Sequence, residues 1–209
     1  HQKGYTDELK PIPVAKSARE DEVATEKQVS AARGLMGSLQ WLTTQTRLDI
    51  GAQTSFGQQA FPRPLVKDLR MMNNALRRAK QFDGLALTIR PIEKDQIAFL
   101  LHTDASLANA KRKHTQAGYM VAAVEKKVLD NQQGWWSPQS WRSGHLKRVV
   151  ASTMASESQA LTRGLRELEW TICLWVDIDE GLDVQDRNPQ VSKFSKMVVP
   201  PNAAVTDCK

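Results

Sequence analysis

The sequence predicts an α/β protein in which a helical segment precedes a mixed sheet with a packed helix. Apolar residues in the first part of the chain recur at three- and four-residue steps, which is the period of amphipathic helices. Short apolar runs bounded by glycine, proline and polar turns follow, as is typical of strands. A long helical stretch and one more short apolar run complete the order helices, strands, helix, strand, which favours a mixed α/β architecture.

Three helices are predicted in the first part of the chain, over residues 26–46, 49–60 and 65–82. In the first, Leu35, Leu39 and Leu42 share one face. The second ends where Phe61-Pro62-Arg63-Pro64 interrupts the pattern, because proline does not continue a helix. The third carries an apolar stripe on one side and lysine and arginine on the other.

A change of period after residue 84 predicts strands. They are expected over 85–89, 97–103, 118–124, 134–137 and 203–207, with a helix over 153–176 and a polar loop over 177–202. We therefore divide the chain into an extended polar segment (1–25), a helical segment (26–91) and an α/β domain (92–209). A chain that opens on His1 and stops at Lys209 is expected to be part of a longer protein, so the α/β domain is expected to be C-terminally truncated.

The composition is that of a globular protein, with 41% hydrophobic and 25% charged residues. Lys+Arg 29 against Asp+Glu 23 gives a net charge of +6, which is compatible with a polyanionic partner without requiring one. The two cysteines, Cys173 and Cys208, lie far apart and predict neither a zinc site nor a disulfide framework, so a reducing compartment is expected. No apolar run is long enough to span a bilayer, and no membrane partner is expected.

Three carboxylates stand at positions where solvated surface carboxylates are not expected. Asp104 and Asp207 each end an apolar strand, and Glu157 heads the apolar stripe of the long predicted helix. Burying an unpaired charge costs several kcal/mol, and bringing such groups together adds repulsion. Divalent cations remove both penalties, and Mg²⁺ prefers carboxylate oxygens. Two ions at such a site activate a water and stabilise the leaving oxygen of a phosphodiester.

Each of these carboxylates can also have a purely structural role. An aspartate after a strand often accepts hydrogen bonds from turn amides. A glutamate in the first turn of a helix is favoured by the helix dipole. Local rules do not decide between these roles and catalysis.

Four segments in order carry a resemblance to a known family. They are 102–106 (HTDAS), 115–119 (TQAGY), 134–140 (GWWSPQS) and 151–160 (ASTMASESQA). In this order they resemble the RNase H domain of copia-type retrotransposon polyproteins. Upstream, residues 35–42 (LMGSLQWL), 46–50 (TRLDI) and 75–80 (ALRRAK) resemble the end of the family's reverse transcriptase, with Leu48 in place of the usual proline. The resemblance covers about residues 30 to 207.

The resemblance implies an RNase H-like sheet with Asp104, Glu157 and Asp207 as catalytic and metal-binding residues. They would hold two Mg²⁺ ions, or Mn²⁺, and cleave RNA in RNA–DNA hybrids. A fourth acidic or histidine position of such domains would lie beyond Lys209, and no YxDD polymerase segment occurs in this sequence. The implied partners are the hybrid and the rest of the polyprotein, in cytoplasmic virus-like particles or in the nucleus.

A catalytically inactive fragment that keeps the fold and at most binds nucleic acid is the alternative. The parent protein is expected to be a polymerase and ribonuclease H, whereas the enzymatic status of this chain alone stays open. Nucleic-acid contacts are predicted at Lys111, Arg112, Lys113, Arg142, Lys147 and Arg148, although solvated turns explain these charges equally well.

Tryptophans in the predicted strands and the long helix allow two interpretations. Trp135, Trp136 and Trp141 either stack on nucleotides or pack in the core, and core packing is favoured because aromatic residues in strands are usually buried. The same reasoning predicts that Trp170 and Trp175 pack on the sheet.

Overall fold

The computed structural model describes residues 2–109, 114–180 and 200–206. By its internal contacts the chain divides into two compact units. The first comprises His1–Leu87, Ser106–Ala117 and Arg142–Ser152, and the second comprises Thr88–Ala105, Gly118–Trp141 and Thr153–Lys209. None of the helices in the described part of the chain is long and apolar enough to cross a membrane.

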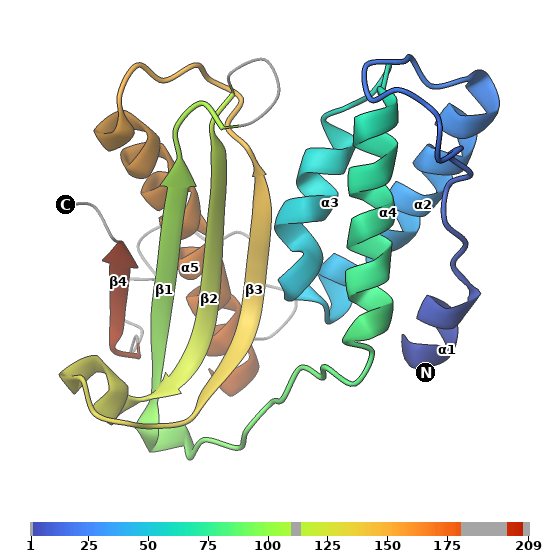
Figure 1. Ribbon diagram of the computed structural model, residues 1–209. Helices are drawn as coiled ribbons and strands as arrows, with labels where there is room; N and C mark the ends of the chain where they lie inside the picture. Colours follow the sequence, from blue (N-terminus) through green and yellow to red (C-terminus); the bar gives the residue numbers. More distant parts are fainter. Residues whose placement is uncertain (1, 110–113, 181–199, 207–209) are drawn as a thin grey trace, which may run out of the picture. The chain divides into compact units, whose positions relative to one another are not determined.

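The helices of the first unit follow one another along the chain (Figure 1). They are α1 (Gln2–Glu8), α2 (Glu26–Gln45), the 3-10 turn η1 (Leu48–Ile50), α3 (Gly51–Gln58) and α4 (Val66–Gln81). A capping box explains where α2 begins, because Thr25 and Gln28 bond each other's backbone amides. One apolar core joins these helices, with Leu39, Leu42, Leu69 and Met72 fully buried in it.

Residues 2–8, predicted to be extended, form α1. Tyr5 and Leu9 pack against the core of the helices, and Ile12 is buried within it. The amide of Ile12 donates to Oδ1 of Asn73 in α4 at 2.8 Å, and its carbonyl accepts from Nδ2 of the same side chain at 2.9 Å. A few apolar residues spread along a polar segment therefore anchor it to a core built by other elements.

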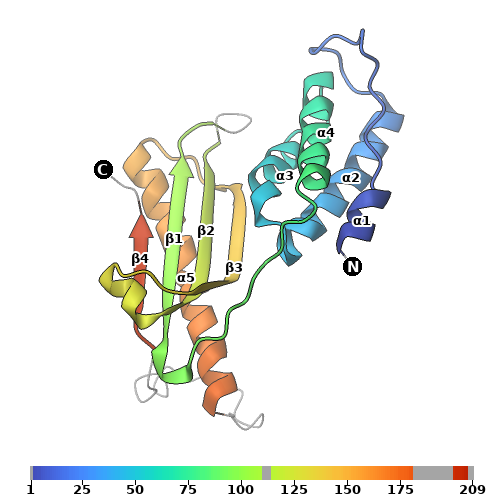
Figure 2. The same cartoon turned by 60° about the horizontal axis from the view of Figure 1, so that its bottom comes forward.

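The sheet has four strands in the order β3-β2-β1-β4, with the long helix α5 covering one face (Figures 1 and 2). The strands are β1 (Ile97–Ser106), β2 (Gln116–Glu125), β3 (Trp136–His145) and β4 (Asn202–Thr206), and α5 covers Thr153–Glu180. Short 3-10 turns, η2 (Lys94–Gln96) and η4 (Lys126–Asp130), precede β1 and follow β2. β4 runs parallel to β1, in register from Phe99↔Asn202 to Thr103↔Thr206. The α/β class with a mixed sheet and packed helices is confirmed.

Strand alternation separates the two faces of the sheet. Phe99 and Leu101 of β1 pack with Leu168 and Ile172 of α5. The neighbours of these β1 residues face the other way, where Ala98 joins a small apolar cluster on the opposite side. One face of β1 therefore packs against α5.

Three boundaries differ from the predictions. Residues 85–89 form no strand: Leu85 and Ile89 are exposed, and neither belongs to the sheet. β3 extends to His145 despite Pro138, because it lies at the edge of the described sheet, where a missing amide donor is tolerated. α5 continues to Glu180, into the predicted loop, while residues 181–199 lie outside the described residues.

The prediction for the tryptophans holds in part. Trp175 packs in the core, edge to face with Phe99 at 6.3 Å between ring centroids. Trp135, Trp136 and Trp170 are exposed, the last to 66%, so the prediction that they are buried is wrong. The guanidinium of Arg90 lies 4.6 Å from the ring centroid of Trp135, a cation–π contact that explains how this ring is held at the surface.

Gly164 sets the distance between α5 and β1. A Cβ atom at this position would lie 2.7 Å from Cγ2 of Thr103 and 2.8 Å from Cδ1 of Leu101. Replacing Gly164 with alanine is expected to lower the free energy of unfolding by about 1–3 kcal/mol, because the helix must move off the strand. Gly37→Ala in α2 is the matched control: nothing lies within 4 Å of its Cβ position, so alanine should stabilise the protein by about 0.5–1 kcal/mol. Urea unfolding measures both, and equal effects would contradict the close contact.

Candidate functional site at the carboxyl end of β1

Glu157 and Asp104 lie on two elements that meet in the second unit. Asp104 lies near the carboxyl end of β1 and is exposed. Glu157 lies in the second turn of α5 and is only 6% exposed. Oε1 of Glu157 accepts a hydrogen bond from the backbone amide of Ala105, the residue after Asp104, at 3.1 Å. The close approach at Gly164, two turns further along the helix, brings the start of α5 to this strand end.

The hydrogen bond from the Ala105 amide to Glu157 lies on the side of β1 that faces β4. The amide of Phe99 donates to the carbonyl of Pro201 at 2.9 Å, so this amide points toward the β4 side of β1. Alternate amides of a strand point the same way, and Ala105 is an even number of residues after Phe99. Glu157 therefore meets β1 at the edge that β4 pairs with, beyond the last described residue of β4.

The side chain of Asp104 projects from the other face of the strand. Thr103 faces α5, as its closeness to Gly164 shows, so alternation places Asp104 on the opposite face together with His102. Both side chains are exposed. Asp104 and Glu157 thus approach the end of β1 from different directions. That both carboxylates bind the same cation stays a prediction.

Asp104 opens onto a shallow hollow of about 380 Å³. Its lining comes from three adjacent strands: His102, Thr103, Asp104, Gly118, Tyr119, Met120, Val205 and Thr206. Sequence reasoning did not single out His102 as a functional residue. The sequence pattern that could have identified His102 is its position two residues before Asp104 in a predicted strand, which places both side chains on one face.

Asp207 lies outside the described residues, as do Lys111, Arg112 and Lys113. The residue before Asp207, Thr206, is paired with Thr103, the residue before Asp104. Among the described residues, no three histidine, cysteine, aspartate or glutamate side chains come together as a metal-binding group. The three-carboxylate site predicted from the sequence depends on Asp207 and stays a prediction.

The donor chemistry at this strand end fits a hard divalent cation. Asp104 and Glu157 offer carboxylate oxygens, the ligands that Mg²⁺ prefers, and the exposed Asp104 leaves room for water or phosphate ligands. The imidazole of His102 beside Asp104 is also compatible with Mn²⁺, which accepts nitrogen ligands more readily. Burial and the nearby Asp177 and Glu169 raise the pKa of the Cys173 thiol in α5.

The described basic residues of the predicted nucleic-acid contacts lie in the first unit. Arg142 belongs to β3, and Lys147 and Arg148 follow it in the chain. All three are exposed, and none forms an ion pair with another described residue. Their charges are available to an external anion.

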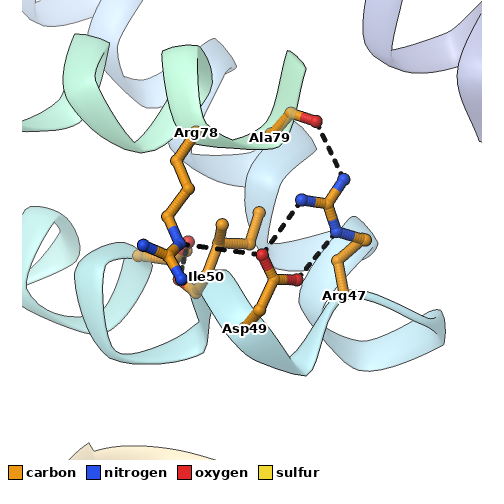
Figure 3. Close-up of polar contacts among 6 residues, drawn as sticks. Arg47, Asp49, Ile50, Arg78 and Ala79 are labelled. Carbon is orange, nitrogen blue, oxygen red and sulfur yellow. Dashed lines mark hydrogen bonds and ion pairs between the residues drawn. The ribbon is translucent and has the colours of Figure 1, made fainter. Parts of the chain in front are cut away.

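The TRLDI segment forms a structural ion pair (Figure 3). Nε of Arg47 lies 2.7 Å from Oδ1 of Asp49, and Nη2 lies 3.0 Å from Oδ2. Nη1 of Arg47 donates to the carbonyl of Ala79 in α4 at 2.8 Å. The Arg47 side chain is 1% exposed, and Arg78 approaches the same carboxylate from the surface at 3.8 Å. This segment holds the end of α2 to α4.

Gln116, in the TQAGY segment of the family resemblance, also has a structural role within the first unit. Its Nε2 donates to the hydroxyls of Ser55 at 3.0 Å and Ser143 at 2.8 Å, and its Oε1 accepts from Nε2 of Gln59 at 3.0 Å. A buried amide with its donors and acceptor engaged stabilises the packing, so the motif residue is explained without a ligand.

Comparison with family models, with curated proteins and with solved structures finds no match for this chain. Its function is therefore inferred from the chemistry of the site and from the motif resemblance.

Proposed function

We propose that this chain carries an RNase H-like domain of a copia-type retrotransposon polyprotein, which cleaves RNA in RNA–DNA hybrids with divalent cations. The observation that carries the proposal is the buried Glu157 carboxylate, which bonds the backbone of β1 at the residue after Asp104. Glu157 and Asp104 place two carboxylates at the end of one strand, and carboxylate oxygens are the ligands that Mg²⁺ prefers.

The topology supports the same proposal. β1, β2 and β3 are consecutive neighbours, and the chain then returns through α5 to place β4 parallel to β1 on its other side. Parallel neighbours end at the same edge of a sheet, and ligands of α/β proteins commonly bind at the carboxyl ends of such strands. This is the arrangement that the motif resemblance implies for Asp104, Glu157 and the residue that follows Thr206.

Each residue has a distinct part in the proposed reaction. Bound Mg²⁺ or Mn²⁺ would supply an activated water and charge stabilisation at the phosphodiester. Asp104 and Asp207 would hold the cations, and Glu157, fixed by the Ala105 amide, would keep its carboxylate oriented toward them. Arg142, Lys147 and Arg148 would bind backbone phosphates, and the 2′-hydroxyls of the RNA strand would distinguish the hybrid from DNA.

A non-catalytic nucleic-acid-binding fragment is the second candidate. The exposed Arg142, Lys147 and Arg148 favour it, because they offer phosphate contacts that do not depend on the carboxylates. The two candidates differ in a single measurable property, which is hydrolysis of the RNA strand.

Incubation of the chain with a labelled RNA–DNA hybrid and Mg²⁺ tests the proposal. We expect cleavage of the RNA strand that falls by about 10²-fold or more in Asp104→Asn, because loss of one charged group at such a site removes transition-state stabilisation. Asp95→Asn is the matched control: this aspartate, in η2, is exposed and bonds Nε2 of Gln96.

The outcomes separate the candidates. Cleavage that Asp104→Asn reduces and Asp95→Asn leaves unchanged supports the nuclease. Cleavage that survives Asp104→Asn contradicts the assignment of the site. Hybrid binding without cleavage, weakened by Arg142→Ala and by added salt, supports the second candidate.

A further inference from the structure

We propose that His114 and His145 form a binding site for a late first-row divalent cation such as Zn²⁺, separate from the carboxylates at the end of β1. Both residues belong to the first unit. His114 precedes β2, and His145 is the last residue of β3. The proposal does not depend on the nuclease activity.

The backbone brings the two histidines to one face. The amide of Leu146 donates to the carbonyl of Thr115 at 2.8 Å, so these two residues lie opposite each other where β2 and β3 pair. His114 and His145 are then diagonal neighbours across the pair, on the same face by alternation. Diagonal positions are within reach of ring side chains.

The ring geometry matches a shared metal ion. The ring centroids are 5.4 Å apart, with the planes at 57°. Zn²⁺ binds imidazole nitrogen at about 2.1 Å, which places each ring centre roughly 3 Å from the ion and two such centres roughly 5 Å apart at a tetrahedral angle. The observed separation is compatible with two ligands of one ion.

A second observation points to a ligand at His114. Its Nδ1 is buried, and no described residue forms a hydrogen bond with it. A buried ring nitrogen without a partner costs free energy, which a coordinated cation or a bound donor recovers. An imidazole nitrogen is a ligand that suits late first-row transition metals.

Two imidazole ligands leave the remaining coordination positions of the ion open. Imidazole suits Zn²⁺, Ni²⁺ and Cu²⁺ better than Mg²⁺, so the site selects a different class of cation from the carboxylates. The exposed Arg142, Lys147 and Arg148 lie close in sequence to His145 and oppose a bare cation. They equally favour an anionic oxygen, such as phosphate or the nucleic-acid backbone, as a further ligand of the ion. A bound ion would fasten the end of β3 to the segment that enters β2.

Calorimetric titration of the full chain with ZnCl₂ at pH 7.5 tests the proposal, after chelation and dialysis have removed adventitious metal. We expect the affinity for Zn²⁺ to fall by at least about tenfold in His114→Ala and in His145→Ala, because each removes one of two chelating ligands. The double variant should lose little more than either single variant. Cys173→Ser, which removes a thiol of the second unit, is the control and should keep the affinity of the parent.

An NMR titration of the unmodified protein with Zn²⁺ tests the proposal even if the variants fail to fold. Zn²⁺ should shift the imidazole NMR signals of His114 and His145 together, before those of His102. Equal Zn²⁺ affinity in the parent and the double variant would overturn the proposal. So would loss of binding in Cys173→Ser, or a titration in which the His114 and His145 signals do not move.

Discussion

Replacing Arg47 with methionine is expected to lower the free energy of unfolding by about 3–5 kcal/mol, because it leaves a largely buried carboxylate without its main partner. The side chain of Asp49 is only 19% exposed and depends on two hydrogen bonds from Arg47. The carbonyl of Ala79 would lose its donor as well. Methionine keeps most of the volume, so the loss reports charge and hydrogen bonding rather than a cavity. Urea unfolding followed by circular dichroism measures it.

Arg78→Met is the matched control for this ion pair. Arg78 approaches the same carboxylate at 3.8 Å, but its side chain is 47% exposed. Its removal should cost less than about 1 kcal/mol, as for other solvent-exposed ion pairs. The double variant Arg47→Met/Asp49→Leu should recover much of the lost stability, since no buried charge is then left unpaired. Equal losses of unfolding free energy in Arg47→Met and Arg78→Met would show that the buried ion pair contributes no more to stability than the exposed one.

Replacing Glu157 with glutamine is expected to reduce hybrid cleavage by about 10²-fold or more while leaving the protein folded. Glutamine retains an oxygen that accepts the hydrogen bond from the Ala105 amide, so the contact between α5 and β1 persists. What it loses is the negative charge that a divalent cation requires. Initial rates of RNA cleavage at saturating Mg²⁺, with the melting temperature as a check of folding, measure the effect.

Glu167→Gln supplies the comparison on the same helix. Oε1 of Glu167 accepts a hydrogen bond from the hydroxyl of Ser140 at 2.6 Å, and glutamine preserves this acceptor too. Its cleavage rate should equal that of the parent. A Glu157→Gln variant that cleaves as fast as Glu167→Gln would remove Glu157 from the proposed site, whatever the result for Asp104.

The periodicity of apolar residues predicted the helices and strands that pack one face in a hydrophobic core. The three helices between residues 26 and 82 appear within a few residues of their predicted bounds, as α2, α3 with η1, and α4. The strands β1, β2 and β4 also lie where short apolar runs predicted them. The burial of Glu157 at the head of the α5 stripe was predicted from spacing and is confirmed.

Residues 85–89 illustrate what a local pattern leaves out. Their apolar run satisfies the composition of a strand, yet a strand exists only where another strand receives its hydrogen bonds. Trp170 follows the same principle: its ring lies on the outer side of α5, because Leu168, Ile172 and Val176 already occupy the side that packs on the sheet.

The amino-acid sequence by itself determined the α/β class, the positions of most helices and strands and the presence of carboxylates beside apolar stripes, because period and composition are local properties of the chain. Tertiary structure alone decided that Glu157 bonds the amide of Ala105, that Asp104 and His102 share the opposite face, and that His114 meets His145. These relations join residues far apart in the chain, and their geometry depends on strand pairing and on the close approach of α5 at Gly164.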